Sequence, residues 1–441
     1  MLHRILFGVM ALAACSTSSL ALAQTQAAAP AAQMAPPIAG EDALEAAWKK
    51  YYANVQKAHD NILKSEQYRL FAPQRAMAYY SLMEAQAMVY NFAVAPQLAS
   101  PRIFQATGWQ TELYTLGGNS SDFHYGTLFL DGNLTYRLTG NINDTAVLLA
   151  QWAGSLPGVK AYTPPKSYDF ADFEIAKDGS FEVILSATEV KGKNWIKLDP
   201  AARYQWILFR PMMGGWDKKP ADMKIERISD IDLNAYRQKE TAPAAVAERI
   251  DFAADYLQFL VDQWNIDYYP RMRANAGGEN KLATLTLDTA GDVGSPAAQY
   301  MQGVFVIDDG EALVVEMDNP RGAFWTIQLF DSWLKSIDFR TRQSSLNMDQ
   351  VARDPDGKYR FVVSKRDPGI ANWLDTGGVE RGMLLVRNYR TQKLADAPKV
   401  TRVKFDELDK YISKDVARVT AEQRKDEIRK REAAYIQRLG E

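Results

Sequence analysis

Hydrophobic residues recur every three or four positions in four parts of the chain, and we expect each of these parts to be helical. The first helix begins near Glu41, and the others cover roughly 73–92, 242–268 and 405–439. Pro96 lies beyond the end of the second pattern, and the third is predicted to end before Pro270. The inward stripe of the first helix is Leu44, Trp48, Tyr51, Val55 and Ile62. That of the last is Phe405, Leu408, Ile412, Val416 and Val419.

Alternating and β-branched patterns fill the stretches between these helices, over residues 110–230 and 282–392. Segments such as LTYRLTG, FEVILSA and YQWILFR are typical of strands. Asp-Gly pairs such as Asp131-Gly132 and Asp178-Gly179 separate them as turn signals. Both stretches are therefore predicted to form β-sheets.

The two strand-rich stretches repeat each other. DGSFEVILS begins at Asp178 and DGKYRFVVS at Asp356, an offset of 356 − 178 = 178 residues. A shared order of turns and strands over such a length indicates an internal duplication. At the same offset, or after a one-residue slip, the following residues also correspond: Asp131 with Asp309, Gln151 with Gln328, Ser186 with Ser364, Asn194-Trp195 with Asn372-Trp373, Arg203 with Arg381, and Arg210 with Arg387.

The predicted fold is therefore α+β and mostly β, with two related antiparallel β-sandwich-like domains braced by N-terminal, central and C-terminal helices. The domain organisation that we expect is a signal peptide over 1–23, an Ala/Pro-rich linker over 24–40, an N-terminal helical segment over 41–105, a first β domain over 106–235, a connecting helix over 236–280, a second β domain over 281–400 and a charged C-terminal helix over 401–441.

The first 26 residues, MLHRILFGVMALAACSTSSLALAQTQ, are typical of a secretory signal peptide. Cleavage after Ala21-Leu22-Ala23 would release a periplasmic or secreted protein. Leu12-Ala13-Ala14-Cys15 resembles a lipobox, so a lipid anchor at Cys15 and an outer-membrane lipoprotein are the alternative. The apolar run is too short and interrupted for a transmembrane span.

Charge and cysteine content narrow the possible functions. The 52 basic and 54 acidic residues give a net charge of −2, without the basic clusters that nucleic-acid binding requires. Cys15 is the only cysteine, so we expect no disulfide, cysteine nucleophile or cysteine metal site in the mature chain. The chain lacks the GxGxxG, GxxxxGK[ST], HExxH and GxSxG motifs, which disfavours dinucleotide oxidoreductases, nucleotide hydrolases, metalloproteases and the usual serine hydrolases.

Several of these segments also resemble a known family. FWTIQLFDSWLKSIDFRTRQSSLN, DPDGKYRFVVS and RDPGIANWLDTGGVERGMLLVRNYR are similar to the C-terminal region of the domain-of-unknown-function 1214 family. The upstream segments LTYRLTG, DGSFEVILS and NWIKLDPAARYQWILFR are similar to the half that precedes it, so the resemblance covers roughly 41–400. It implies a mostly β fold with helical additions, and no agreed reaction. The chain has GGNSSDFHYG where related proteins often have an Asn-Pro-Asp-Asn-like segment.

Histidine is the usual acid or base near neutral pH, and His124 is the best placed of the three, in a polar loop that enters a strand. A loop-filling role is its alternative. His59 lies near the buried stripe of the first helix and is expected to be structural. Two mature histidines without cysteine disfavour a zinc site, so we assign no metal ligands and expect no cofactor. A Ca²⁺ or Mg²⁺ site made of oxygen ligands is the alternative, although no DxDxDG loop supports it.

A denser polar and aromatic cluster occurs in the second copy. Residues found in one copy only are better candidates for a site than residues shared by both, because shared residues serve the common fold. In an uninterrupted strand Trp325, Asp331 and Trp333 would share one face, which predicts a carboxylate between two rings. Asp331 is thus a candidate catalytic base, and Trp325, Trp333, Arg340 and Asn347 are candidate ligand contacts. The alternative is a core face with Asp331 capping a turn.

The loop KRDPGIANWLD, which begins at Lys365, adds further candidates. Asp367, Asn372 and Trp373 would line a pocket rim, with Arg381 beside them, or would form a well-satisfied structural loop. The Asn-Trp pair also occurs in the first copy, which favours the structural role.

Three functions follow from these patterns. The first is an exported cell-envelope protein that binds a small organic, aromatic or sugar-like ligand in a cleft of the second β domain. The second is a cofactor-free acid/base enzyme, such as a lyase, hydratase, isomerase or hydrolase, that uses Asp331 or His124. The third is a structural or assembly protein without a small-molecule site.

Overall fold

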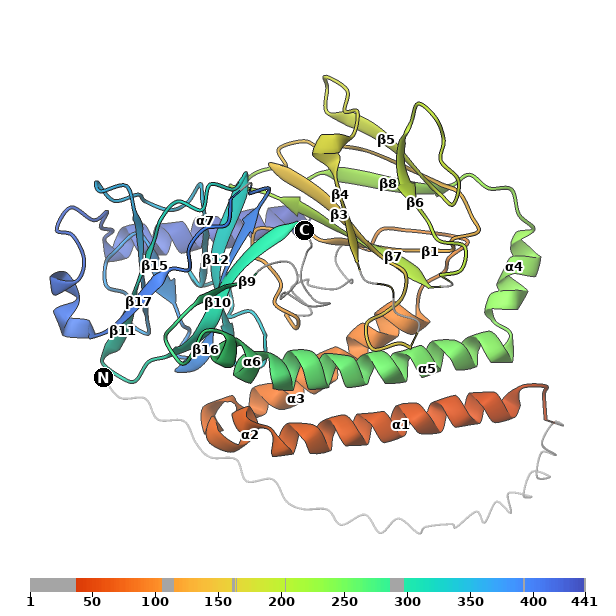
Figure 1. The fold of residues 1–441 in the computed structure, drawn as a ribbon, viewed down its shortest axis with the longest axis horizontal. Helices are drawn as coiled ribbons and strands as arrows, with labels where there is room; N and C mark the ends of the chain where they lie inside the picture. Colours follow the sequence, from red (N-terminus) through yellow and green to blue (C-terminus); the bar gives the residue numbers. More distant parts are fainter. Residues whose placement is uncertain are drawn as a thin grey trace, which may run out of the picture. The chain divides into compact units, whose positions relative to one another are not determined.

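The two halves of the repeat form two β-sandwiches, which Figure 1 shows together with the helices. This computed structural model describes residues 37–104, 115–160, 163, 165–202, 204–285, 297–391 and 393–439. Within it, residues Gly40–Glu441 form one compact unit. The expected signal peptide and Cys15 lie outside the described residues.

The first sandwich consists of two four-stranded sheets. One has the order β1-β7-β3-β4, and the other has the order β6-β5-β2-β8. Their strands are β1 (Gly126–Leu130), β2 (Tyr136–Asn141), β3 (Val147–Ala153), β4 (Lys166–Asp169), β5 (Ser180–Ser186), β6 (Asn194–Lys197), β7 (Gln205–Met212) and β8 (Asp222–Arg227).

The second sandwich contains a five-stranded and a four-stranded sheet. Their orders are β13-β12-β16-β10-β9 and β15-β14-β11-β17. The strands are β9 (Ala283–Leu285), β10 (Ala298–Val306), β11 (Glu311–Met317), β12 (Phe324–Asp331), β13 (Ser345–Asn347), β14 (Tyr359–Ser364), β15 (Trp373–Asp375), β16 (Arg381–Tyr389) and β17 (Lys399–Lys404).

The two sandwiches have the same topology, which confirms the duplication. β10-β16-β12-β13 repeats the order β1-β7-β3-β4, and β15-β14-β11-β17 repeats β6-β5-β2-β8. Most pairs are antiparallel, and the pairs β5–β6 and β14–β15 are parallel in both copies. β9 is an addition at the edge of the second copy. The expected α+β fold with two related sandwiches is therefore correct.

Helices precede, connect and follow the sandwiches. α1 makes its main contacts with α5, and the two lie side by side in Figure 1. The helical segments are α1 (Glu41–Lys64), α2 (Glu66–Leu70), η1 (Ala72–Gln74), α3 (Arg75–Val89), the π-helical η2 (Tyr90–Val94), η3 (Phe170–Asp172), α4 (Leu233–Glu240), α5 (Pro243–Phe259), the π-helical η4 (Leu260–Asp267), α6 (Tyr268–Asn275), η6 (Phe405–Lys410) and α7 (Ala421–Leu439).

The helices depart from the expected pattern in three places. The central helix continues past Pro270 into α6, after the π-helical η4. The C-terminal helix begins only at Ala421, although Leu408, Ile412 and Val416 are buried as expected. Within α1, Trp48 is 54% exposed, and Ala47 and Ala58 are buried instead.

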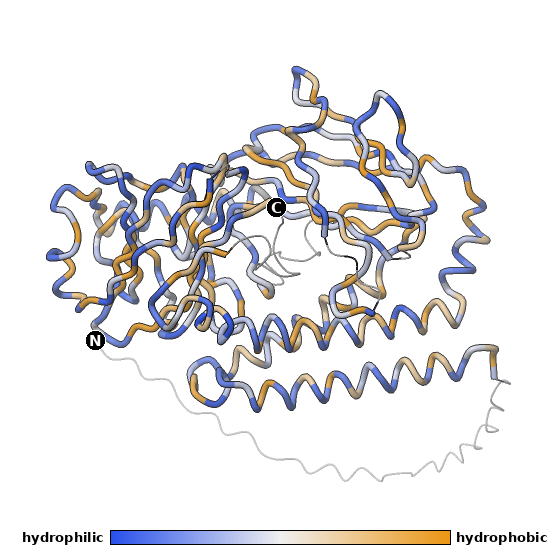
Figure 2. The backbone as a smooth tube through the Cα atoms, viewed as in Figure 1, coloured by the Kyte–Doolittle hydropathy of each residue, from blue (hydrophilic) through white to orange (hydrophobic). Residues whose placement is uncertain are grey.

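Each sandwich has its own core, and a third and larger core joins both sandwiches to the helices. Residues alternate between these cores along the central strands. On β7, Ile207 and Phe209 face the interior of the first sandwich, whereas Trp206, Leu208 and Met212 belong to the joint core. Figure 2 shows hydrophobic and hydrophilic positions mixed along α1 and α5, as expected for helices that bury one side.

Candidate functional site

The two predicted tryptophans lie in different cores. Trp325 is inside the second sandwich, where its ring packs edge-to-face on Tyr359 at a centroid distance of 5.1 Å. Trp333 belongs to the joint core, and its indole donates a 3.0 Å hydrogen bond to the Gln74 carbonyl. The expectation of one shared face is wrong because β12 ends at Asp331, and Trp333 follows in a turn.

Asp331 caps that turn. Its Oδ1 accepts hydrogen bonds from the backbone N–H groups of Trp333, at 2.8 Å, and Lys335, at 3.0 Å. Burial raises the pKa of Asp331 to about 6, although the amide and charge of Lys335 act in the opposite direction. The Lys335 ammonium in turn forms a 2.5 Å ion pair with Glu84 of α3. The capping alternative therefore describes the contacts of Asp331.

Other predicted contacts are spread over the second copy. Arg340 is exposed. Arg381 is half-buried, with its guanidinium 5.4 Å from the centroid of the Phe71 ring. Asp367 accepts a 3.0 Å hydrogen bond from Arg424 of α7. Arg203, the repeat partner of Arg381, lies outside the described residues. The structure thus does not gather Asp331, Trp325, Trp333 and Arg340 into one site.

Asn372 and Trp373 make the same contacts as their counterparts in the first copy. The Trp373 indole donates to the carbonyl and hydroxyl oxygens of Ser364, as the Trp195 indole donates to Ser186. The Asn372 amide joins the backbone of Ala352 to that of Arg360. Asn194 joins Glu174 to Glu182 at the same offset of 178 residues. These contacts hold the parallel strand of each sandwich in place.

Asn347 instead contacts a segment of the first copy. This segment also contains His124, which is a candidate site residue from the sequence. Residues 116–125 cross from the second sandwich to the end of β7. Gly118 has φ +70°, a conformation that favours glycine, and a Cβ there would also make a tight 3.2 Å contact with the Leu334 side chain. The His124 amide donates a 3.0 Å hydrogen bond to the Pro211 carbonyl, and its side chain is half-buried.

At the centre of this segment, Asp122 is fully buried. Its Oδ1 accepts from the Trp216 indole at 3.1 Å and from the Asn347 amide at 2.8 Å. Its Oδ2 accepts from the hydroxyls of Thr326, at 2.6 Å, and Ser121, at 3.2 Å. Four donors therefore satisfy this carboxylate, which joins the two copies of the repeat.

Two arginines lie beside this segment, and neither was among the site residues predicted from the sequence. Arg210 on β7 and Arg387 on β16 are 4% and 5% exposed, and they occupy equivalent positions on equivalent strands. Each donates to a glutamine that is also conserved between the copies, Gln151 or Gln328. Arg387 also donates to the carbonyl of Gly118. The signal was present in the sequence as a shared Gln–Arg pair, but a shared residue was assigned to the common fold.

Tyrosines surround both guanidinium groups. The pKa values of Tyr125 and Tyr389 are raised by burial, and the charges of both arginines oppose that rise in each case. Both cations are thus electrostatically close to the same two phenols. Tyr268, whose pKa is raised to about 12 mainly by burial, donates a 3.1 Å hydrogen bond to Gln302 at the same core. The phenols therefore remain neutral at physiological pH.

Neither arginine has a charged partner within the described residues: no carboxylate there lies within ion-pair distance of Arg210 or Arg387. A guanidinium carries five N–H donors. Within the described residues, Arg210 donates one side-chain hydrogen bond and Arg387 donates two, none of them to a carboxylate. The side chain of Tyr389 is 1% exposed, and the centroid of its ring lies 5.5 Å from that of Phe123. We call this group of Arg210, Arg387, Tyr125 and Tyr389 the arginine seam.

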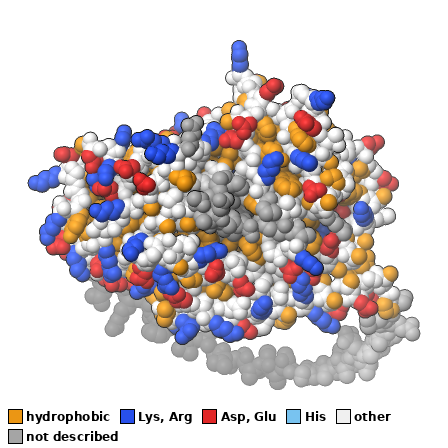
Figure 3. Space-filling model, viewed as in Figure 1, with side chains coloured by type: hydrophobic (Ala, Val, Ile, Leu, Met, Phe, Trp, Pro, Cys, Tyr) orange, Lys and Arg blue, Asp and Glu red, His pale blue; other side chains and the backbone are white. Residues whose placement is uncertain are grey.

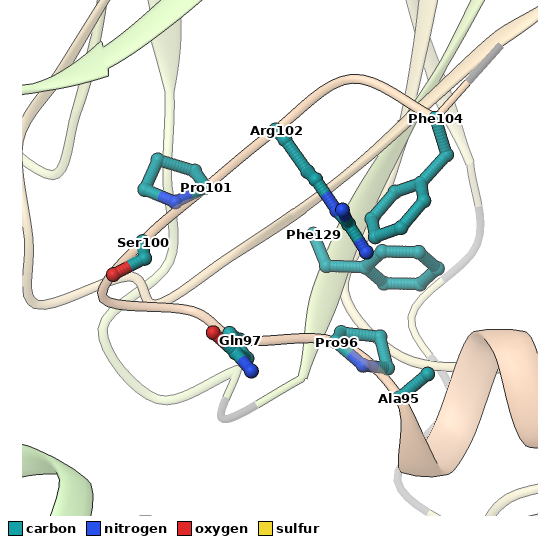
Figure 4. Close-up of a pocket in the computed structure, with 8 residues that line it drawn as sticks. All are labelled: Ala95, Pro96, Gln97, Ser100, Pro101, Arg102, Phe104 and Phe129. Carbon is teal, nitrogen blue, oxygen red and sulfur yellow. The ribbon is translucent and has the colours of Figure 1, made fainter.

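Three cavities elsewhere contain none of the predicted site residues. A cavity of about 290 Å³ lies between Pro96, Pro101, Arg102, Phe104 and Phe129, where Figure 4 shows the Arg102 side chain beside both phenylalanine rings. The second, of about 370 Å³, includes Asp131, Tyr236 and Arg249. The third, of about 610 Å³, lies along α7 and includes Trp216, Gln343 and Arg431.

Searches for metal clusters and membrane spans gave two further findings. Among the described residues, no group of three or more His, Cys, Asp or Glu side chains is arranged to hold a metal ion. Within the same residues, every helix is too short or too polar to cross a membrane.

The fold consists of two β-sandwiches that are related by duplication, together with added helices. Residues 309–393 match the family described as "Protein of unknown function (DUF1214)", which confirms the resemblance seen in the motifs of the second copy. No curated protein matches the chain.

Two solved structures are similar. An uncharacterised protein from Burkholderia cenocepacia is 24% identical with a TM-score of 0.72, over 83% of this chain and 99% of that one. This similarity shows a shared fold. A protein from Vibrio parahaemolyticus is 14% identical with a TM-score of 0.43, over 74% of this chain and 97% of that one.

Proposed function

We propose that this protein binds a small organic acid, a carboxylate or phosphate ester, at the arginine seam between its two sandwiches. The observation that supports this is the pair of buried guanidiniums, Arg210 and Arg387, without a carboxylate partner in the described residues. The proposal keeps the small-molecule ligand expected from the sequence. It moves the site from the second β domain to the seam, and it favours an acidic ligand over a neutral sugar.

The physical argument concerns the cost of burying charge. An ionised group removed from water is strongly destabilising unless it is paired, and arginine cannot escape by losing its proton. Chains keep such groups where a ligand supplies the missing charge. Arginine also suits this role because its planar donors match a carboxylate or phosphate in a bidentate manner. The surrounding phenol rings offer apolar surface and neutral hydrogen-bond donors for the rest of the ligand.

A titration series on the purified full chain tests the proposal. Thermal-shift and calorimetric measurements would compare small aliphatic and aromatic carboxylates and phosphate esters with the corresponding neutral amides and alcohols. We expect acids to raise the melting temperature and the neutral analogues to leave it unchanged. Arg210→Gln should abolish the shift, whereas Arg137→Gln, which removes an exposed partner of Glu226, should leave it intact. Equal shifts with neutral analogues would refute the proposal.

The stability of ligand-free Arg210→Gln gives an independent test. If Arg210 is kept for binding, replacing its charge by a neutral amide should leave the free energy of unfolding unchanged or raise it, since the guanidinium makes one hydrogen bond, to Gln151. If the residue is purely structural, the substitution should cost roughly 1.5–3 kcal/mol, as the loss of a buried hydrogen bond from a charged group does.

Export remains part of the proposal. We propose that residues 1–23 direct the chain to the periplasm or medium, and that a lipid anchor at Cys15 in the outer membrane is the alternative. Cell fractionation of the wild type and Cys15→Ser separates them. Release of the wild type in soluble form supports cleavage at Ala23. A membrane-bound wild type that Cys15→Ser converts to a soluble form supports the anchor, and retention of both in the cytoplasm contradicts export.

One observation favours a second candidate, acid/base catalysis by Asp331. Its pKa of about 6, raised by burial, would let the carboxylate exchange a proton near neutral pH. Against this, the carboxylate already accepts two backbone hydrogen bonds, as a turn cap does. For any compound that the protein converts, Asp331→Asn should abolish turnover and retain binding. Unchanged turnover would exclude Asp331 as the base.

A further inference from the structure

The duplication places the two arginines around a common centre. Arg210 lies two residues before Met212 at the end of β7, and Arg387 lies two residues before Tyr389 at the end of β16. Both strand ends contact the same segment of the chain. Phe123 forms a bridge with Met212, and its ring lies 5.5 Å from that of Tyr389, between centroids. The equivalent cations thus approach one another from opposite copies.

The charges around this centre do not balance. Both guanidiniums are positive at any physiological pH. The neighbouring phenols of Tyr125 and Tyr389 are neutral and contribute no negative charge. The buried carboxylate of Asp122, on the segment that both strand ends contact, already accepts four hydrogen bonds, none of them from an arginine. Within the described part of the chain, two positive charges therefore lack a negative partner that a bound molecule could supply.

From this arrangement, and resting on the proposed function, we infer that the ligand is a dianion with two separate acidic groups, one held by Arg210 of the first copy and the other by Arg387 of the second. The two guanidiniums are carried by different strands of different copies, and each can bind one acidic group in a bidentate manner.

The two ends of the site differ in rigidity. Arg387 is held by Gln328 and by the carbonyl of Gly118, and its guanidinium lies 5.3 Å from the centroid of the Phe330 ring. Arg210 has only Gln151 as a partner in the described residues. Arg387 is thus the fixed end, and Arg210 adapts to the length of the ligand. Phe123 and Phe330 beside them suit an apolar or aromatic spacer between the two acidic groups.

Matched diacids and their monoamides test this inference. The probes are succinate, glutarate and terephthalate, each compared by calorimetry with the molecule in which one carboxylate is an amide of the same shape. For at least one pair we expect the diacid to bind about tenfold or more tightly than its monoamide. In Arg210→Gln the two should bind equally, because the second charge has lost its partner. Arg137→Gln serves as the control and should keep the wild-type ratio.

The outcomes separate the inference from the proposed function. If diacids and monoamides bind the wild type equally, and Arg210→Gln weakens both, the inference is wrong and an acid-binding site remains. If Arg210→Gln keeps the wild-type preference for diacids, Arg210 does not bind the second acidic group. The inference is then also wrong. If neither these probes nor any acid of the wider series binds the wild type, both the inference and the proposed function are wrong.

Discussion

The side-chain amide of Asn347 donates a 2.8 Å hydrogen bond to the carboxylate of Asp122, although the two residues belong to different copies of the repeat. Sequence analysis had placed Asn347 in a ligand site. In the structure it is fully buried and fixes a segment of the first copy against β13 of the second. Duplicated domains have no inherent reason to dock, and this buried network supplies one.

Removing the Asp122 carboxylate should therefore separate the copies. Asp122→Ala removes the carboxylate that accepts from the Trp216 indole and the Asn347 amide, and we expect a loss of roughly 3–5 kcal/mol in the free energy of unfolding. Asp122→Asn keeps one accepting oxygen and should cost less. Urea denaturation of both variants measures these differences. The control is Glu226→Ala, which removes an exposed ion pair with Arg137 and should cost about 0–1 kcal/mol. A loss in Asp122→Ala no larger than this would contradict the network's role.

The Asn-Trp pair of each copy should respond to substitution as a structural element. Asn372→Ala removes three hydrogen bonds to the backbone of Ala352 and Arg360, at a cost of roughly 2–4 kcal/mol. The equivalent Asn194→Ala should cost less, because Asn194 is only half-buried. Neither substitution should change the affinity for an acid that binds the arginine seam. A large loss of affinity in Asn372→Ala at unchanged stability would restore Asn372 as a ligand contact.

Much of the fold was predictable because its signals are local or periodic. Alternation marks the strands, and a constant offset of 178 residues marks the duplication. The turn after β12 could also be predicted, because Asp331 accepts a hydrogen bond from the amide only two residues later. The sequence does not show that Asp331 ends the strand, so Trp333 was placed on the wrong side.

The arginine seam was not predictable in the same way. The bond from Arg387 to Gly118 spans 269 residues, and that between Arg210 and Gln151 spans 59. Sequence periodicity places Arg210 and Arg387 on equivalent faces of equivalent strands, but it does not say that these faces meet. Arg424 and Arg431 of the charged helix α7 show the same limit, because both are buried and donate hydrogen bonds to the second sandwich.

Asp331 predicts a specific pH dependence of stability. Its pKa is raised from 3.8 to about 6 in the folded chain, so between these values the folded state holds a proton that the unfolded state releases. The free energy of unfolding should then be highest below pH 4 and fall as the pH rises to about 6, by on the order of 3 kcal/mol from this group. Lys335 and Glu84 are the charged neighbours that modulate it. In Asp331→Asn, which cannot ionise, this component should vanish, and identical pH profiles of the two proteins would contradict the shift.

The passage of the helix through Pro270 gives the last prediction. Proline has no N–H for the carbonyl four residues earlier, which is that of Ile266. In the structure the amide of Gln67 donates to this carbonyl at 2.8 Å and to that of Asn265 at 3.1 Å. The side chain of Gln67, which is fully buried, thus supplies the hydrogen-bond donor that Pro270 lacks.

A double-mutant cycle tests whether the Gln67 amide takes the place of the backbone N–H that Pro270 lacks. Gln67→Leu alone should cost roughly 2–3 kcal/mol because it leaves buried carbonyls unpaired. Pro270→Ala restores an N–H in the helix, so the double variant should be more stable than the sum of the single effects by about 1 kcal/mol, measured by urea denaturation. The matched control is Gln86→Leu, whose amide donates to the unrelated carbonyl of Leu82 and should show no coupling to Pro270→Ala. Additive effects for Gln67 and Pro270 would mean that the Ile266 carbonyl does not connect the two residues energetically.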